Sequence, residues 1–495
     1  MEILRILRKL LKSKNREALT WKVTSGGFWV FLSNALSQVT GIVKMIVLAR
    51  LLIPSDFGLI GIAGFILSIL DLISKPGFRA ALIQKEGDIK DYINSIWGIT
   101  ILRGAGLCLI VFFSAPFVAQ FFKAPNAVSI IRAMSFTFLL NSLTNPGVVY
   151  FVKNLDFRRQ FIFDISGTLV DVAVAIPLAL LLRNVWALVI TSLADYVANV
   201  FISYVICSYR PSLFGYNAEK AKELFRYGKW ISGINLIGLL INQGDNAFVG
   251  RFLGVNALGF YSQAFKFSNI PATQVTGIVS QVAFPAYSQL QGDIKRLREW
   301  YLKTLQVISF ISIPLAGGMF ALASEFTHIF LGDKWMPMVP AFQVLSLYGL
   351  VRSIAGTTGT LFQAVGKPDI LAKLVFVRLV MMALLIYPLS LYWGIVGTSL
   401  AVFLSALFID PFSYYMVIRI IECSIWDFFK IILLPLINTV IMVLLIFGLK
   451  NYNLTQIRII NFLLIAVLGA LLYFGMTYFI EGTLNHRIKD KVTTL

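Results

Sequence analysis

The stretch GFWVFLSNALSQVTGIVKMIVLARLLIPSDFG, residues 27–58, decides the fold because a related stretch returns later in the chain. It aligns without a gap with GKWISGINLIGLLINQGDNAFVGRFLGVNALG, residues 228–259. The identical pairs include Trp29 with Trp230 and Arg50 with Arg251. Internal similarity at one fixed register indicates that the chain contains two copies of one structural unit.

The composition is that of a membrane protein. Hydrophobic residues make up 58% of the 495 residues, charged residues 14%, and the mean hydropathy is +0.80. A soluble domain has about 25% charged residues. Apolar runs of about 20 residues can cross a bilayer as helices. We therefore predict an all-α polytopic membrane protein without a sizeable extramembrane domain.

The hydropathy pattern predicts fourteen transmembrane helices. They cover residues 26–50, 57–83, 93–120, 128–152, 161–182, 186–208, 228–250, 256–287, 300–324, 338–365, 370–391, 394–418, 430–449 and 457–480. The repeat places the first span onto the seventh, with an even number of passages between the two. The halves are therefore expected to be parallel repeats related by an axis along the membrane normal.

This reasoning predicts the domain organisation. We expect a basic amphipathic cytoplasmic segment over residues 1–22, an N-terminal six-helix lobe over 23–208, a cytoplasmic linker over 209–227, a C-terminal six-helix lobe over 228–420, transmembrane helices 13 and 14 within 421–480, and a cytoplasmic tail over 481–495. No small-residue cleavage site follows the first segment, so we do not expect a removable signal peptide.

The net charge of +19 is distributed unevenly. Lys and Arg concentrate in alternate loops, beginning with the N-terminal segment, as in membrane proteins whose basic loops remain in the cytoplasm. The pattern predicts that both termini are cytoplasmic and does not favour nucleic-acid binding. The 3 Cys and 2 His show no metal-ligand spacing. We expect no metal and no cofactor.

Several charged residues fall inside the apolar spans, where an unpaired charge is costly. Asp71, Lys75 and Arg79 are spaced four apart and share one helix face. Arg103, Arg352 and Arg378 lie deeper in their spans. Arginine suits bidentate binding of phosphate or carboxylate. The basic excess predicts an anionic cargo; the alternative is that these arginines form salt bridges with neighbouring helices.

The repeat also pairs Lys44 with Asp245, because each lies six residues before the matched arginine. We predict that the two approach each other across a cleft between the lobes and hold an outward gate shut. A structural ion pair or a protonated acid is the alternative.

Four stretches carry a family resemblance. They are ARLLIPSDFGLIGIA (49–63), LDFRR (155–159), NQGDNAFVGRFLGVNALGFYSQAFKF (242–267) and LFQAVGKPDILAK (361–373). In these stretches the chain resembles the Wzx-type oligosaccharide flippases of the MOP superfamily, in the branch that contains the colanic acid and teichuronic acid exporters. The resemblance extends over nearly the whole chain.

The resemblance implies two lobes around a central cavity that opens alternately to either side of the bacterial inner membrane. It implies a flippase, not an enzyme, that moves an undecaprenyl-pyrophosphate-linked oligosaccharide for export and works with a polysaccharide polymerase and chain-length machinery. Cationic residues would bind the anionic cargo: Lys44, Lys75, Arg79, Arg103, Arg352 and Arg378. Some relatives couple transport to H⁺ or Na⁺, for which the candidates are Asp71, Asp171 and Asp245.

Two other functions stay open at this point. A multidrug or cation antiporter of the same fold should have acid-lined lobes, whereas the embedded charge here is predominantly basic. A membrane-embedded polysaccharide polymerase or glycosyltransferase needs a larger extramembrane loop for its catalytic groups. The longest outer connection, ASEFTHIFLGDKWMPMV at 323–339, is too short for that.

Overall fold

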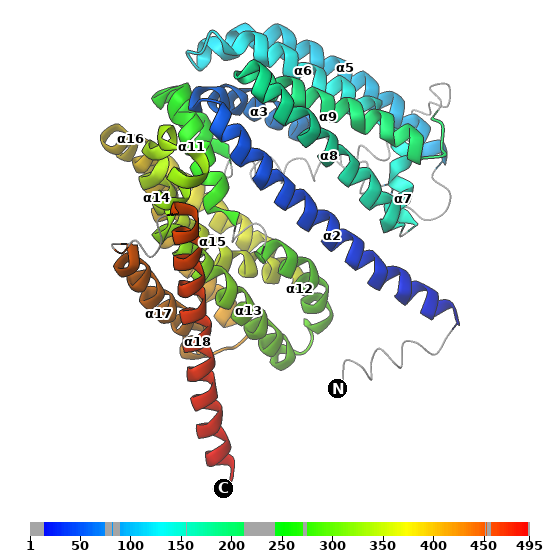
Figure 1. Cartoon of the computed structure of the whole chain (residues 1–495). Helices are drawn as coiled ribbons and strands as arrows, with labels where there is room; N and C mark the ends of the chain where they lie inside the picture. The colour runs from blue at the N-terminus through cyan, green and yellow to red at the C-terminus, as the bar shows by residue number, and fades with distance from the viewer. Residues whose placement is uncertain are drawn as a thin grey trace. The chain divides into compact units, whose positions relative to one another are not determined.

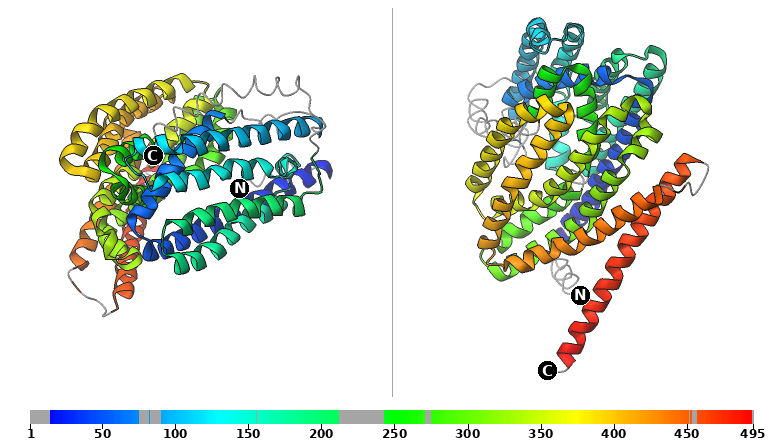
Figure 2. Two further views of the ribbon diagram at one scale, coloured as in Figure 1. Left: turned by 90° about the horizontal axis from the view of Figure 1, so that it is seen from above. Right: turned by 90° about the vertical axis from the view of Figure 1, so that its left-hand side faces the viewer.

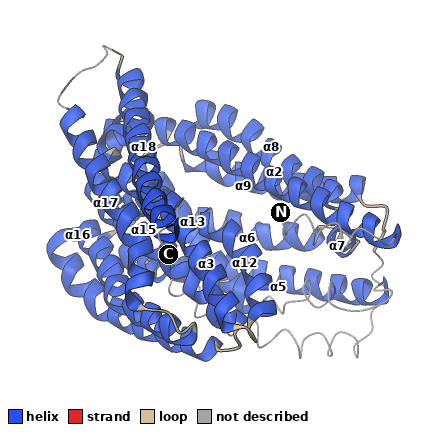
Figure 3. Ribbon diagram, turned by 90° about the horizontal axis from the view of Figure 1, so that it is seen from below, coloured by secondary structure: helices blue, strands red, loops and turns tan. Residues whose placement is uncertain are grey.

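A computed structural model describes residues 14–74, 82, 90–154, 156–211, 243–270, 275–450, 452 and 457–493. Within these ranges the regular secondary structure is entirely helical (Figure 3). Two compact units divide the chain, Met1–Asn256 and Ala257–Leu495, and each is described by itself. The prediction of an all-α fold is confirmed.

Ten helices among the described residues are long and apolar enough to cross a membrane, or eleven when a bent pair counts as one span. The prediction of a polytopic membrane protein is therefore confirmed, while the number fourteen is not. Three predicted segments lie partly or wholly outside the described residues: the first 13 residues, the linker at 209–227 from residue 212 on, and the beginning of the seventh span. The predicted domain boundaries stay a prediction.

The N-terminal unit is a bundle of helices. They are α2 (Lys14–Leu51), α3 (Pro54–Ser74), α5 (Lys90–Phe121), α6 (Ala127–Leu143), η1 (Pro146–Val148), α7 (Val149–Lys153), α8 (Phe157–Leu182) and α9 (Val185–Ile206). Helix α2 packs along α8, α8 along α9, and α5 along α6 (Figure 1). The predicted fourth span, 128–152, is bent by 63° between α6 and η1.

The sequence explains this bend. The residue before a proline is driven away from helical geometry, so α6 stops before Asn145-Pro146. Asn145 has extended backbone angles, and its side chain accepts a hydrogen bond from the Gly147 backbone N–H. Its amide nitrogen also donates to the Tyr209 carbonyl at 2.8 Å. The break is thus capped by side-chain hydrogen bonds, which the freed backbone groups need inside a membrane.

The C-terminal unit contains most of the remaining helices. A π-helix at Val249–Leu253 leads into α11 (Val255–Ser268), at the boundary between the units; then follow α12 (Thr276–Leu290), α13 (Ile294–Ala321), α14 (Ala323–Phe326), η5 (Thr327–Leu331), η6 (Asp333–Met338), α15 (Val339–Ala364), α16 (Pro368–Ile420), α17 (Ile425–Lys450) and α18 (Arg458–Thr493). Helices α17 and α18 form a hairpin (Figure 2), and α17 packs against α13.

Helix α16 has 53 residues, too many for one passage across a bilayer. It is interrupted at Gly394, where φ is +55° and ψ is −131°. Glycine adopts a positive φ at little cost because it lacks a Cβ atom. The break falls where the sequence predicts a turn between spans 370–391 and 394–418.

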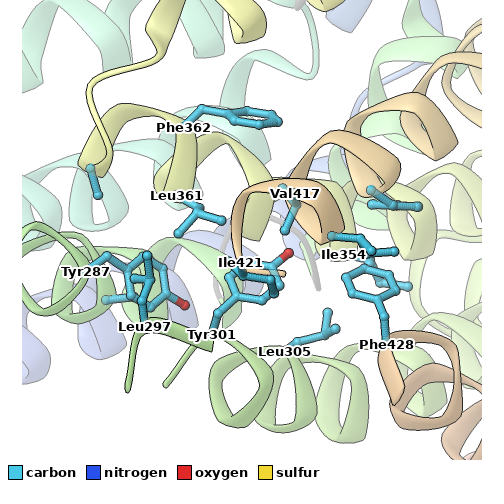
Figure 4. Close-up of a cluster of buried hydrophobic side chains, with 14 of the residues drawn as sticks. Tyr287, Leu297, Tyr301, Leu305, Ile354, Leu361, Phe362, Val417, Ile421 and Phe428 are labelled. Carbon is cyan, nitrogen blue, oxygen red and sulfur yellow. The ribbon is translucent and has the colours of Figure 1, made fainter. Parts of the chain in front are cut away.

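The core of the C-terminal unit is a cluster of apolar and aromatic side chains (Figure 4). Tyr301 is fully buried, and its hydroxyl lies 2.9 Å from Thr357 Oγ1. This hydrogen bond satisfies a polar group that would otherwise be costly to bury. On the outside the helices expose large apolar side chains such as Leu181 and Leu384, as expected for surfaces that face lipid.

Candidate functional site

The N-terminal unit contains a cavity of about 690 Å³, to which α2, α5, α6, α8 and α9 contribute. Its lining combines apolar side chains with neutral hydrogen-bonding residues, which include Ser33, Asn34, Ser37, Thr100, Asn141, Ser142, Thr144, Asn145, Thr168 and Asn199. The carboxylic acids Asp164, Asp171 and Asp195 also line it. Polar groups in membrane spans usually face a water-filled cavity or a partner. This concentration therefore indicates a ligand or ion site.

Lys44 forms an ion pair with Asp171 beside this cavity. The predicted approach of Lys44 to Asp245 stays a prediction. Helix α2 packs along α8, which brings the Lys44 ammonium group against a carboxylate of the same unit. The structure thus brings together Lys44, a predicted cargo-binding base, and Asp171, a predicted ion-coupling acid. Their side chains keep 25% and 20% of their surface exposed.

Arg103 is held by the end of α3. Its Nη2 lies 2.8 Å from Asp71 Oδ1 and 2.8 Å from Ser74 Oγ, and it also donates to the Asp71 backbone carbonyl at 3.1 Å. The carbonyls at a helix C-terminus attract cations. Arg103 therefore has the salt bridge that the sequence left open as the alternative. Lys75 and Arg79 lie outside the described residues.

The C-terminal unit has a smaller cavity of about 250 Å³, lined by Arg352, Arg378 and Asp410 among others. Both guanidinium groups lie near the ring of Tyr348, with their central carbons 5.9 and 5.2 Å from its centroid. Arg378 Nη2 donates to the Tyr348 hydroxyl at 2.9 Å, and Arg352 Nη1 donates to Asn269 Oδ1 at 3.2 Å. This cavity is therefore basic, and an aromatic ring positions its two arginines.

Asp410 and Asp195 belong to these two cavities, although sequence reasoning did not select them as site residues. Asp410 is 5% exposed, and its buried Oδ2 has no hydrogen-bond partner in the described residues. Asn199 Nδ2 donates to Asp195 Oδ1 at 3.0 Å. Both acids are visible in the sequence as embedded charges. Their cavities depend on which helices pack together, and no sequence signal specified this.

Asp245 is buried, with 1% of its surface exposed. The backbone N–H of Asn246 donates to its Oδ1 at 2.8 Å. The π-helix Val249–Leu253 follows, and π-helical turns occur frequently at functional sites. A gating role for Asp245 stays a prediction. Among the described residues no group of three His, Cys, Asp or Glu side chains could hold a metal ion.

Solved structures share this architecture. The chain superposes with "Lipid II flippase MurJ, inward closed conformation" at a TM-score of 0.74, with 15% identity, over 92% of this chain and 98% of the other. A multidrug resistance MATE family transporter in an inward-facing conformation gives a TM-score of 0.64, with 15% identity, over 78% of this chain and 96% of the other. The chain therefore shares the fold of these two proteins.

The sequence comparisons identify the family. The chain belongs to the polysaccharide biosynthesis protein family, which matches residues 47–340. It is 24% identical over 408 residues to the lipopolysaccharide biosynthesis protein WzxC of Escherichia coli (strain K12), covering 81% of this chain and 82% of that protein. It is 23% identical over 438 residues to the teichuronic acid biosynthesis protein TuaB of Bacillus subtilis (strain 168), covering 87% and 89%. The resemblance to the MOP superfamily flippases is confirmed.

Proposed function

We propose that the protein is a flippase that moves a polyprenyl-pyrophosphate-linked oligosaccharide from the cytoplasmic to the outer face of the plasma membrane by alternating access. One observation carries the proposal: two arginines, Arg352 and Arg378, line one cavity inside apolar helices. The comparisons support the proposal. The chain shares the fold of a protein named as a lipid II flippase, and its relatives in sequence are named for the biosynthesis of polysaccharides.

The arginine pair supplies the chemistry that an anionic headgroup requires. A guanidinium has five N–H donors in a rigid plane and remains charged inside the membrane. Arg378 uses one of its donors on the Tyr348 hydroxyl, and this hydrogen bond restrains its orientation. Phosphate oxygens would accept charge-assisted hydrogen bonds from the remaining donors, each worth about 1.5–3 kcal/mol. We infer that Lys75 and Arg79 also bind the anionic headgroup. We infer that Lys44 and Arg103 bind it only in a conformation in which their ion pairs with Asp171 and Asp71 are broken.

Ion coupling would act through the carboxylates that hold these bases. Protonation of Asp171 would remove the negative charge that binds Lys44, and protonation of Asp71 would do the same for Arg103. Each event changes the relative stability of two conformations when the pair exists in only one of them. We therefore propose that Asp71, Asp171 and Asp245 couple transport to H⁺ or Na⁺.

We also propose that both termini lie in the cytoplasm of a bacterial cell. The protein would work together with a polysaccharide polymerase and chain-length machinery.

A second candidate is export of cationic drugs, because three carboxylates line the N-terminal cavity and a multidrug transporter shares the fold. The basic C-terminal cavity argues against a cationic cargo. Replacing both arginines separates the two functions, since the loss of positive charge would impair transport of an anion and favour transport of a cation.

The test uses Arg352→Gln and Arg378→Gln in the full chain, reconstituted in vesicles with fluorescent undecaprenyl-pyrophosphoryl oligosaccharide extracted from its own cells. We expect flipping to fall about tenfold or more for each variant. Lys373→Gln is the matched control, because Lys373 is exposed near the start of α16 and pairs with Asp369. Normal flipping by both arginine variants would refute the assignment.

A further inference from the structure

We infer that the 690 Å³ cavity of the N-terminal unit binds the uncharged sugar rings of the cargo. The inference rests on the proposed function and adds a binding site for the carbohydrate. The volume lies within the range of about 300–1,000 Å³ typical of small-molecule sites. It is far larger than a site for a proton or a single monovalent ion, so ion coupling does not account for it.

Among the described residues, the charge of the lining does not favour the headgroup as its ligand. Asp164, Asp171 and Asp195 line the cavity, and Lys44 beside it is paired with Asp171. A pyrophosphate placed beside them would meet like charges, which is unfavourable at low dielectric. The acids also do not form a metal site among the described residues. A neutral ligand rich in hydrogen-bonding groups fits this lining.

The hydroxyl groups of the lining are arranged to accept hydrogen bonds. Thr100 Oγ1 donates to the Ile96 carbonyl at 2.8 Å, and Ser142 Oγ donates to the Leu139 carbonyl at 2.7 Å. Because each hydroxyl has a single hydrogen, these two present lone pairs to the cavity. The carboxylate of Asp195 is a further acceptor. Sugar hydroxyls are donors as well as acceptors, so they complement such a surface.

Trp97 supplies an aromatic face. It lines the cavity from α5, and Tyr196 lines it from α9. Its indole Nε1 is buried, so the carbon atoms of the ring are the part of Trp97 that a ligand can contact. An aromatic ring packs against the C–H groups of a sugar ring, so the two aromatic residues complement the hydrogen-bond acceptors of the lining.

The experiment measures binding to the full-length protein in lipid nanodiscs with two probes. One is undecaprenyl pyrophosphate without sugar, and the other is the lipid-linked oligosaccharide purified from the protein's own cells. We expect Trp97→Ala to weaken binding of the sugar-bearing probe about tenfold and to leave the sugar-free probe unchanged. Trp97→Phe, which keeps an aromatic ring, should give a smaller loss.

Trp300→Ala is the matched control, because Trp300 is 45% exposed on α13 and lies outside the cavity. Asn141→Leu, on α6, tests the cavity independently of the tryptophan. Equal binding of both probes by the wild-type protein, or equal loss of both in the cavity variants, would overturn the sugar site and leave the flippase function intact. Binding of neither probe by the wild-type protein would instead refute the flippase function.

Discussion

The two cavities differ in size and in the charge of their linings. The N-terminal cavity is large and combines neutral polar groups with three carboxylates, whereas the C-terminal cavity is small and contains two arginines with one carboxylate. Both are built from apolar helices whose outer surfaces face lipid. The comparison teaches that the helical scaffold does not determine the sign of the charge it encloses. A few side chains decide it in each half.

The two cavities also stabilise their bases differently. Lys44 has a carboxylate partner, so its charge is neutralised within the unit. Arg378 instead has a neutral phenol and its ring as partners, with Asp410 beside the same cavity. A base with neutral partners retains its positive charge for a ligand. We therefore expect the N-terminal pair to respond to loss of charge, and the C-terminal arginine to respond to a change of shape.

The largest expected effect comes from breaking the N-terminal pair. Asp171→Leu leaves the Lys44 ammonium without its carboxylate, which we expect to cost about 2 kcal/mol, less than a fully buried pair because both side chains are partly exposed. The melting temperature of the purified protein and its export activity should both fall. The exchange Lys44→Asp with Asp171→Lys should recover part of the stability. No recovery would show that the pair does not act as a charge pair.

A second prediction separates charge from shape. Lys44→Arg should keep transport close to normal, because any cation can pair with Asp171. Arg378→Lys should reduce transport about tenfold, because an ammonium group cannot reproduce the planar fork of donors that the guanidinium beside Tyr348 offers to a ligand. Initial flipping rates in vesicles measure both variants. Equal effects of the two exchanges would remove this distinction between the cavities.

The smallest expected effects come from one added methyl group in each cavity. A Cβ atom at Gly167 would lie 2.6 Å from Asn199 Oδ1, and one at Gly356 would lie 2.4 Å from Thr276 Cγ2. Gly167→Ala displaces a flexible amide, whereas Gly356→Ala meets a methyl group of a β-branched side chain that is stiff. We expect both variants to fold. Gly356→Ala should lose about 1 kcal/mol of the free energy of unfolding and should show the larger fall in melting temperature. A larger fall for Gly167→Ala would contradict this order.

Much of the architecture could be predicted from the sequence because helices in a bilayer must satisfy their own backbone hydrogen bonds. Length and apolarity were therefore enough to locate α8, α9, α13 and α17 to within six residues at each end. The bend at Asn145-Pro146 was harder, since proline occurs within many membrane helices without ending them. In α8, for example, Pro177 lies inside an unbroken helix.

The sequence by itself determined that the chain is an all-helical membrane protein with charged residues inside its spans, because hydropathy and charge are properties of single residues. The partners of those charges came from the tertiary structure alone. Lys44 meets Asp171, Arg103 meets Asp71, and Arg352 and Arg378 share Tyr348. Such pairs join residues far apart in the chain, and they depend on which helix faces pack together. The periodicity of a single helix contains no information about its neighbour.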